Sequence, residues 1–532
     1  MSFSSTLDRP EATTYSVDDL LRDVKNGKIK IPRFQRQFRW ESEDMLKLLD
    51  SIYRGYPIGN LLFWETDSDQ KAKSVIGPDD IEETAKVTKL IIDGQQRITT
   101  LVGIFLLPDD DDSDKKWHIY FDLKTKKFEI PKQKTKVPYY WIPLREVFDT
   151  VRFLTWLRTL PVTKESEGLI HEANQLSKSL RDYKIPAYIV RTDDEKILRE
   201  IFERLNTGGK PLTDTEVFNS LFGRTDDTEP DDLSAVRKEF ERYGFGSIKE
   251  NDLLKSLQAV LGIDINIKFD KVKDLLKQKD ERTIHKTITE LHDVLKTVAD
   301  FLEKDAGICH ISLLPYPFSL RPLIKFFYLF RNPSDETRKE LSRWLWRATT
   351  SGYFYRITAQ PIKRIFTSIE DTESQTVERL TEISKDFSYP EIKTDKYIGL
   401  GNASTKIFCN YLISLNPKNF INGEQFEAKP IIEEEGLNVF QKFTKINGSD
   451  LEVKNKVLEE GFCNRFFYPA SKSSEISKNM MESDGSVLQS HAIPPAIAVY
   501  WRKGEIEEFL KRRQSFIKED MNRYLEERRG QI

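Results

Sequence analysis

The stretch LIIDGQQRITTL, residues 90–101, constrains the fold of this chain more than any other. The branched apolar run that ends at Ile92 is typical of a buried β-strand, and apolar residues at helical spacing begin at Ile98. Asp93 and Gly94 stand between them and are common turn residues. We therefore predict a buried strand that passes directly into a helix, with Asp93 at the carboxyl end of the strand and at the N-cap of the helix.

This junction carries more polar residues than a turn requires. The carboxyl end of a strand is the usual ligand position in open α/β arrangements, and the N–H groups of a helix start attract anions. Arg97 adds a bidentate donor, while Gln95 and Gln96 can each donate and accept. Asp93 suits a divalent cation or the positioning of an attacking water. Taken alone, the pentapeptide also fits a surface turn in which Asp93 only caps the helix and the other side chains are solvated.

Two further stretches carry residues of the same kind. IPRFQRQFRW, residues 31–40, interleaves arginines and glutamines with aromatic residues; this pattern suits phosphate contacts and base stacking, or a packed edge with solvated arginines. FERLNTGGKPLTDTE, residues 202–216, contains a Gly-Gly loop that lets backbone approach a phosphate or simply ends a helix. Within it, Thr213 and Glu216 have the spacing of a capping box for the next helix.

These stretches, together with YPIGNLLFW at residues 56–64, occur in the order expected for one family. They resemble the N-terminal domain of the GmrSD-type (type IV) restriction enzymes, a ParB/sulfiredoxin-like fold, over residues 15–225. The resemblance implies binding and hydrolysis of an NTP, with Mg²⁺ or another divalent cation, in defence against phage or modified foreign DNA. It assigns catalysis to Asp93, Gln95, Gln96 and Arg97, with Asp93 also the metal ligand. It assigns nucleotide binding to a second set: Gln35, Arg36, Gly94, Arg204, Asn206, Thr207 and Gly208.

The length of 532 residues exceeds what one hydrophobic core supports, so several domains are expected. An acidic segment with Pro230, residues 223–233, is typical of a domain boundary. Apolar spacing of three and four then indicates packed helices to about residue 420. We predict an α+β protein with a ParB/sulfiredoxin-like NTP-binding domain at 1–228, a helical middle domain at 229–420 and a mixed α/β, HNH-like C-terminal domain at 421–532.

Relatives of this family continue into an HNH-type nuclease domain whose centre resembles HHIFP. HNH chemistry needs a histidine to activate water and further residues to hold a metal. The chain has six histidines, and none forms a paired motif. In EEEGLNVFQKF, residues 433–443, Leu437 and Asn438 stand where two histidines are expected. We therefore expect a degenerate, inactive HNH centre, in which His491 of SHAIPP is the one candidate remnant and more plausibly packs or caps.

The composition bears on three classes of protein: DNA-binding proteins, disulfide or zinc proteins, and membrane proteins. Lys+Arg (83) and Asp+Glu (86) nearly cancel, so any DNA-binding surface has to be local. Three scattered cysteines without a CxxC pair argue against a disulfide framework or a zinc ribbon and suit a reducing compartment. The most apolar window, residues 313–330, contains Arg321, Lys325 and three prolines, which indicates core helices and not a membrane span. We expect a cytoplasmic protein without a membrane partner.

Three functions stay open at this point. The first is an NTP-hydrolysing anti-phage protein that acts on or senses foreign DNA, with any DNA cleavage supplied by the N-terminal domain or by a partner defence protein. The second is a non-enzymatic DNA- or partner-binding sensor that holds nucleotide without turnover. The third is a nuclease whose acidic metal ligands the sequence does not reveal. Which nucleotide is bound, which DNA is sensed and whether the protein forms oligomers are also open.

Overall fold

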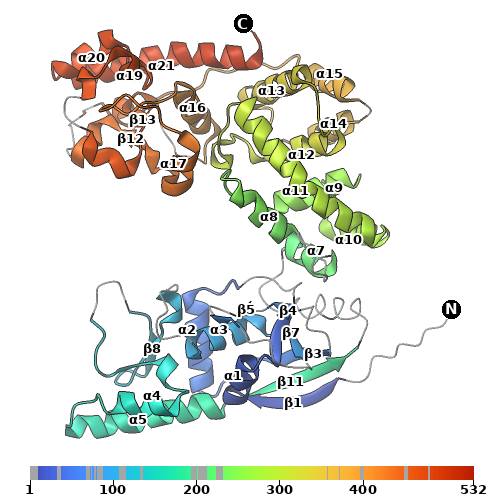
Figure 1. Ribbon diagram of the computed structural model, residues 1–532, viewed down its shortest axis with the longest axis vertical. Helices are drawn as coiled ribbons and strands as arrows, with labels where there is room; N and C mark the ends of the chain where they lie inside the picture. The colour runs from blue at the N-terminus through green and yellow to red at the C-terminus, as the bar shows by residue number, and fades with distance from the viewer. Residues whose placement is uncertain are drawn as a thin grey trace. The chain divides into compact units, whose positions relative to one another are not determined.

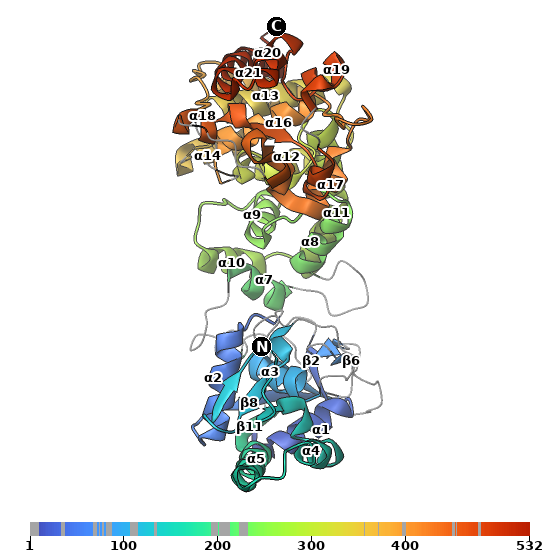
Figure 2. The ribbon, with the colours of Figure 1, turned by 90° about the vertical axis from the view of Figure 1, so that its left-hand side faces the viewer.

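A computed structural model describes most of the chain, in the following residues: 10–32, 38–66, 72–73, 75–76, 79–80, 88–106, 115–131, 136–192, 201, 213–222, 232–355, 357–370, 372–395, 399, 401–448, 453, 455–476 and 480–531. The chain forms two compact units, unit 1 (Met1–Thr228) and unit 2 (Glu229–Ile532) (Figures 1 and 2). Unit 1 combines a mixed sheet with helices and unit 2 is mainly helical, which confirms the predicted α+β class.

A six-stranded sheet organises unit 1. Its order is β1-β11-β3-β7-β2-β4, in which β3 and β2 flank β7. The strand β7 runs antiparallel to β3 and parallel to β2, so the predicted buried strand lies inside the sheet. The bounds are β1 Glu11–Ser16, β2 Ile29–Pro32, β3 Leu61–Thr66, β4 Ala72–Lys73, β7 Thr88–Asp93 and β11 Lys184–Arg191.

Apolar residues cover both faces of this sheet. Leu61 and Phe63 of β3 belong to the larger core, whereas Leu62 and Trp64 belong to a smaller core on the other face. Burial on both faces explains why these strands read as continuous apolar runs and not as alternating ones. The larger core also takes residues from five helices (Figure 1): α1 Val17–Lys25, α2 Ser42–Tyr53, α3 Gln95–Phe105, α4 Thr150–Leu157 and α5 Lys164–Asp182.

Smaller elements complete unit 1. A three-stranded sheet has the order β10-β8-β9, and a short hairpin pairs β5 with β6. The first helix is capped by Ser16, whose hydroxyl accepts the Asp19 N–H at 3.0 Å. The bounds are β5 Val75–Ile76, β6 Asp79–Asp80, β8 Tyr120–Asp122, β9 Lys127–Glu129, β10 Trp141–Pro143, α4 Thr150–Leu157 and α7 Asp214–Phe222.

Packed helices form the first part of unit 2, as the apolar spacing predicted. In α11 the residues Ile284, Ile288, Leu291 and Leu295 are fully buried at intervals of three and four. The window 313–330 contributes α12 to this core, and no helix in the described ranges is long and apolar enough to cross a membrane. The bounds are α8 Leu233–Arg242, α9 Glu250–Val260, α10 Phe269–Lys277, α11 Glu281–Lys304, α12 Leu320–Leu329, α13 Asp335–Thr350, α14 Ala359–Ser368, α15 Glu373–Ile383 and α16 Ala403–Ser414.

The last part of unit 2 contains a two-stranded antiparallel ladder and a long terminal helix (Figure 1). Arg513 of the terminal helix is fully buried and donates to the carbonyls of His491 at 2.8 Å and Cys463 at 2.5 Å. These bonds satisfy a buried charge and tie the helix to the ladder region. The bounds are α17 Ala428–Glu435, η6 Gly436–Val439, β12 Phe440–Lys442, α18 Lys456–Glu460, β13 Arg465–Phe467, α19 Gly485–Gln489, α20 Pro495–Arg502 and α21 Ile506–Arg529.

Candidate functional site

The junction between β7 and α3 has a glycine as its helix cap. We expected Asp93 at the N-cap, and this is wrong: Asp93 is the last residue of the strand, and Gly94 is the N-cap with φ 96°. The left-handed conformation of this turn is inexpensive only for glycine. Space is restricted too, because a Cβ on Gly94 would lie 2.3 Å from Leu61 Cδ2. Since glycine has no side-chain oxygen, the first turn of α3 lacks the usual cap from its N-cap residue.

Arg97 is held tightly at this junction. Its Nη1 donates to the Ile58 carbonyl at 2.7 Å, and its Nη2 donates to the Asn60 carbonyl at 2.8 Å and to Asp93 Oδ2 at 3.1 Å. The Arg97 side chain is 14% exposed and that of Asp93 is 39% exposed. Burial lowers the pKa of the Arg97 guanidinium, against the opposing effect of Asp93. Arg97 therefore fixes the loop before β3 and orients the Asp93 carboxylate.

Gln96 connects the junction to the basic-aromatic stretch. Its side chain is buried, and its Oε1 accepts the backbone N–H of Arg39 at 2.8 Å and that of Trp40 at 3.2 Å. Gln95 is buried as well, with 6% of its surface exposed. Both amides thus lie at the start of α3 inside the protein, which contradicts the alternative of a solvated surface turn for these two side chains.

The stretch at residues 202–216 is joined to the same place. Arg39 Nη1 lies 3.3 Å from Glu216 Oε2, at the start of α7. The predicted capping box is confirmed, because the Thr213 N–H donates to Glu216 Oε2 at 2.7 Å and the Glu216 N–H donates to the Thr213 hydroxyl at 3.3 Å. One chain of contacts, from Gln96 through Arg39 to Glu216, therefore brings together three stretches that are far apart in the sequence.

The structure describes only some of the residues that were predicted to bind or hydrolyse a nucleotide. Asp93, Gly94 and Arg97 meet at the junction, and the two glutamines follow them in the first turn of α3. The remaining predicted nucleotide-binding residues lie outside the described residues, and their role stays a prediction: Gln35, Arg36, Arg204, Asn206, Thr207 and Gly208. Sequence reasoning missed the carbonyls of Ile58 and Asn60, because backbone groups leave no residue-type signal. The glycine between them, Gly59 with φ 86°, was the available hint.

A divalent cation fits this junction only in part. Among the described residues no group of three or more His, Cys, Asp or Glu side chains is placed to hold a metal. Asp93 offers a carboxylate here, and one of its oxygens already accepts from Arg97. Mg²⁺ is commonly held by one or two carboxylates, with phosphate oxygens and water as its other ligands. The residues present therefore fit a cation that arrives with a phosphate ligand.

The C-terminal region shows what replaces the expected histidines. Leu437 and Asn438 lie in η6, immediately before β12, and both are exposed. His491 is fully buried, its Nε2 donates to the Lys418 carbonyl at 2.6 Å, and its ring stacks on Phe420 with centroids 4.2 Å apart. Burial lowers the pKa of His491 to about 3. His491 is therefore a packing residue, as the sequence favoured.

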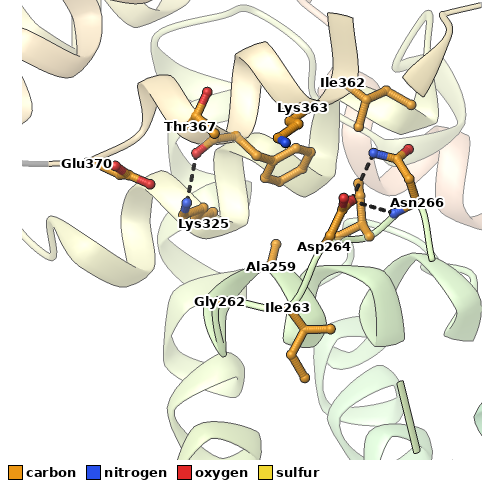
Figure 3. A pocket seen from close by; sticks show the side chains of 12 residues that line it. Ala259, Gly262, Ile263, Asp264, Asn266, Lys325, Ile362, Lys363, Thr367 and Glu370 are labelled. Atoms are coloured by element: carbon orange, nitrogen blue, oxygen red, sulfur yellow. Dashed lines mark hydrogen bonds between the residues drawn. The ribbon is translucent and has the colours of Figure 1, made fainter. Parts of the chain in front are cut away.

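Unit 2 also contains a pocket of about 180 Å³ between the loop after α9 and the helices α12 and α14 (Figure 3). Lys325 lines it, and its Nζ donates to the Phe366 carbonyl at 2.8 Å. Asp264 accepts the backbone and side-chain N–H groups of Asn266, each at 2.9 Å. Lys325 and Asp264 thus form hydrogen bonds with other residues of the pocket wall, and these bonds would compete with a ligand. We therefore place the candidate site at the junction in unit 1.

Comparison with known proteins shows which family the residues of unit 1 resemble. Residues 17–223 match the family model described as the GmrSD restriction endonuclease N-terminal domain. The chain is also 20% identical over 497 residues to an uncharacterized protein of Methanocaldococcus jannaschii, which covers 84% of this chain and 83% of that protein. The ParB/sulfiredoxin-like fold and the degenerate HNH centre stay predictions. The resemblance expected from the four sequence stretches is confirmed over residues 17–223, which match the GmrSD restriction endonuclease N-terminal domain family.

Proposed function

We propose that unit 1 binds an NTP at the amino end of α3 and hydrolyses it, and that the protein is a restriction-type anti-phage protein that acts on or senses foreign DNA. The observation that carries this proposal is the chain of contacts from Gln96 through Arg39 to Glu216. It joins one described residue from each of the three stretches that carry phosphate-binding residue types. The description of the matched family as a restriction endonuclease domain supports the role in DNA restriction.

The chemistry of the junction suits a phosphate group. Backbone N–H groups at a helix start and the helix dipole favour an anion, and Gly94 brings no side chain that would occupy this position. Asp93, with 39% of its side chain exposed, would hold a divalent cation or orient the attacking water. Such a cation neutralises charge on the transferred phosphoryl group. Arg97 keeps Asp93 in place and lies close enough to share the anion's charge.

One observation favours a second candidate, a sensor that holds nucleotide without turnover. The Arg97 guanidinium already donates to two backbone carbonyls and to Asp93. An arginine that stabilises a developing phosphoryl charge has to direct donors at that charge. If Arg97 keeps its present bonds when a nucleotide is bound, it contributes to binding and positioning more than to the chemical step.

Phosphate release by the purified chain separates the two candidates. All four NTPs are compared with and without Mg²⁺ and with and without phage DNA, and nucleotide binding is measured by calorimetry. We expect turnover in the wild type and a loss of at least about tenfold in kcat for Asp93→Asn, because removal of one group that positions metal or water usually costs on this scale. Binding without turnover in the wild type selects the sensor.

Asp50 supplies a matched control. Asp50 and Arg54 form an i,i+4 pair like Asp93 and Arg97, and the Asp50 side chain is 42% exposed, close to the value for Asp93. Asp50→Asn should leave turnover within about twofold, because an exposed surface pair of this kind contributes little. Equal turnover in wild type, Asp93→Asn and Asp50→Asn would show that the junction is not the hydrolytic site.

A further inference from the structure

A second pocket in unit 2 has a different character from the one between α12 and α14. Its volume is about 520 Å³, within the range of ligand sites, and it opens to solvent beside the β12–β13 ladder. Basic and amide side chains line it, and none of the described residues in its wall is acidic. The residues that matter here are Asn438, Gln441, Lys442, Lys445 and Arg465.

Two of these cations face each other across the ladder. Lys442 of β12 and Arg465 of β13 are direct register partners in the antiparallel pair. Direct partners project from the same face of a ladder with their Cβ atoms roughly 5 Å apart, and like charges in such positions repel each other. The repulsion is unfavourable for folding, and an anion placed between the two side chains would remove it.

Lys442 and Arg465 both have contacts within the protein. Lys442 Nζ lies 3.9 Å from Glu459 Oε1, at the outer limit of an ion pair, although only 19% of the lysine side chain is exposed. Arg465 Nη1 donates to the Phe440 carbonyl at 2.9 Å, a neutral acceptor. Lys445 is exposed at the rim and adds a third positive charge. Three basic side chains therefore line the pocket, and no acidic side chain is among the described residues of its wall.

The backbone that carries these cations is held in place. Asn464 is fully buried, and its side chain accepts the Thr444 N–H at 3.2 Å and donates to the Thr444 hydroxyl at 2.9 Å and to the Glu459 carbonyl at 2.8 Å. Asn464 precedes Arg465, and Thr444 precedes Lys445. The Asn464 side chain thus fixes the backbone next to Lys445 and Arg465 before any ligand binds. A preformed backbone lowers the entropic cost of binding.

We propose that this pocket binds a phosphate group, with Lys442, Lys445 and Arg465 as its charged contacts and Asn438 as a polar one. Arginine and lysine together match the oxygens of a phosphate, by a donor fork and by point charges. The open side of the pocket suits a phosphate within a longer chain, such as the backbone of DNA. A free nucleotide or inorganic phosphate has the same chemistry, and the test below separates these sources. The site is separate from the nucleotide junction of unit 1 and does not depend on it.

The test uses the full chain without NTP and compares the double variant Lys442→Gln/Lys445→Gln with the wild type. Lys511→Gln, an exposed lysine on α21, is the matched control. One arm measures the fluorescence anisotropy of a labelled DNA duplex over a series of salt concentrations. The other arm measures the shift in unfolding temperature that inorganic phosphate or ADP produces.

For DNA as the ligand, we expect the double variant to bind on the order of tenfold more weakly, with a salt slope smaller by about 2, one for each lysine–phosphate contact. The single variant Lys445→Gln should lower the salt slope by about 1, and it provides the test if the double variant does not fold. For a free phosphate ligand, DNA binding stays unchanged and the thermal shift is reduced. The proposal is overturned if the wild type binds neither, or if the double variant and Lys511→Gln both match the wild type in both arms. Loss of NTP turnover in Asp93→Asn is measured separately, so failure at one site does not imply failure at the other.

Discussion

Arg97→Ala should destabilise unit 1 and not merely reduce activity. The guanidinium loses bonds to the carbonyls of Ile58 and Asn60 and to the Asp93 carboxylate. A hydrogen bond from a charged donor contributes about 1.5–3 kcal/mol, and the lower end applies to the solvent-accessible Asn60 carbonyl. The half-exposed pair with Asp93 adds roughly 0–1 kcal/mol. We therefore expect the free energy of unfolding to fall by about 3–5 kcal/mol, a large share of the stability of a typical domain.

Hydrogen exchange of the full chain measures this loss where it arises, in peptides that cover β7 and α3. Arg54→Ala is the matched control, because Arg54 is 52% exposed and bonds Asp50 four residues away. Its effect on hydrogen exchange should be small beside that of Arg97→Ala, because exposed pairs contribute little to stability. Arg97→Lys should fall between the two, since a single ammonium cannot reproduce the planar fork. A loss for Arg97→Ala no larger than that for Arg54→Ala would refute the structural role of Arg97. Because Arg97 also supports the fold, a loss of activity in Arg97→Ala would not by itself report on catalysis. Asp93→Asn keeps the bonds from Arg97 to the carbonyls of Ile58 and Asn60, so it is the better test of catalysis.

Two more predictions follow from the geometry. Gly94→Ala should lower the free energy of unfolding, measured by urea titration, by more than about 2 kcal/mol. The reasons are that φ of residue 94 is 96° and that the new Cβ would collide with the Leu61 side chain. A decrease of less than about 1 kcal/mol would argue against the left-handed turn. Burial lowers the pKa of His491 to about 3 in the folded chain. Between pH 6.5 and 3 the unfolded chain therefore binds a proton that the folded chain does not. As the pH decreases through this window, the free energy of unfolding decreases by about 1.4 kcal/mol per pH unit. The difference in unfolding free energy between pH 7 and pH 5 should be smaller by about 2 kcal/mol in His491→Gln than in the wild type, and equal differences would contradict this ionisation.

Several parts of the structure followed directly from local patterns in the sequence. Ser16 caps the first helix, the apolar residues of α11 repeat at three and four, and Thr213 with Glu216 forms the capping box. These features depend on neighbours within four residues, so the sequence contains all the information that they need. The sequence placed Asp93 correctly at the end of the strand but also at the helix cap. The cap is Gly94, because the chain makes the turn into α3 with a left-handed backbone conformation at the glycine.

The sequence by itself determined the strand–turn–helix junction, the family of residues 17–223 and the absence of a paired histidine motif. Only the tertiary structure decided that Arg97 binds backbone carbonyls, that Gln96 holds the Arg39 backbone and that Lys442 stands opposite Arg465. The physical reason is that a residue's type sets which bonds it can form, whereas its partner depends on chain segments that folding brings from distant positions. Carbonyl acceptors and cross-strand registers have no residue signature, and these are the features that define both proposed sites.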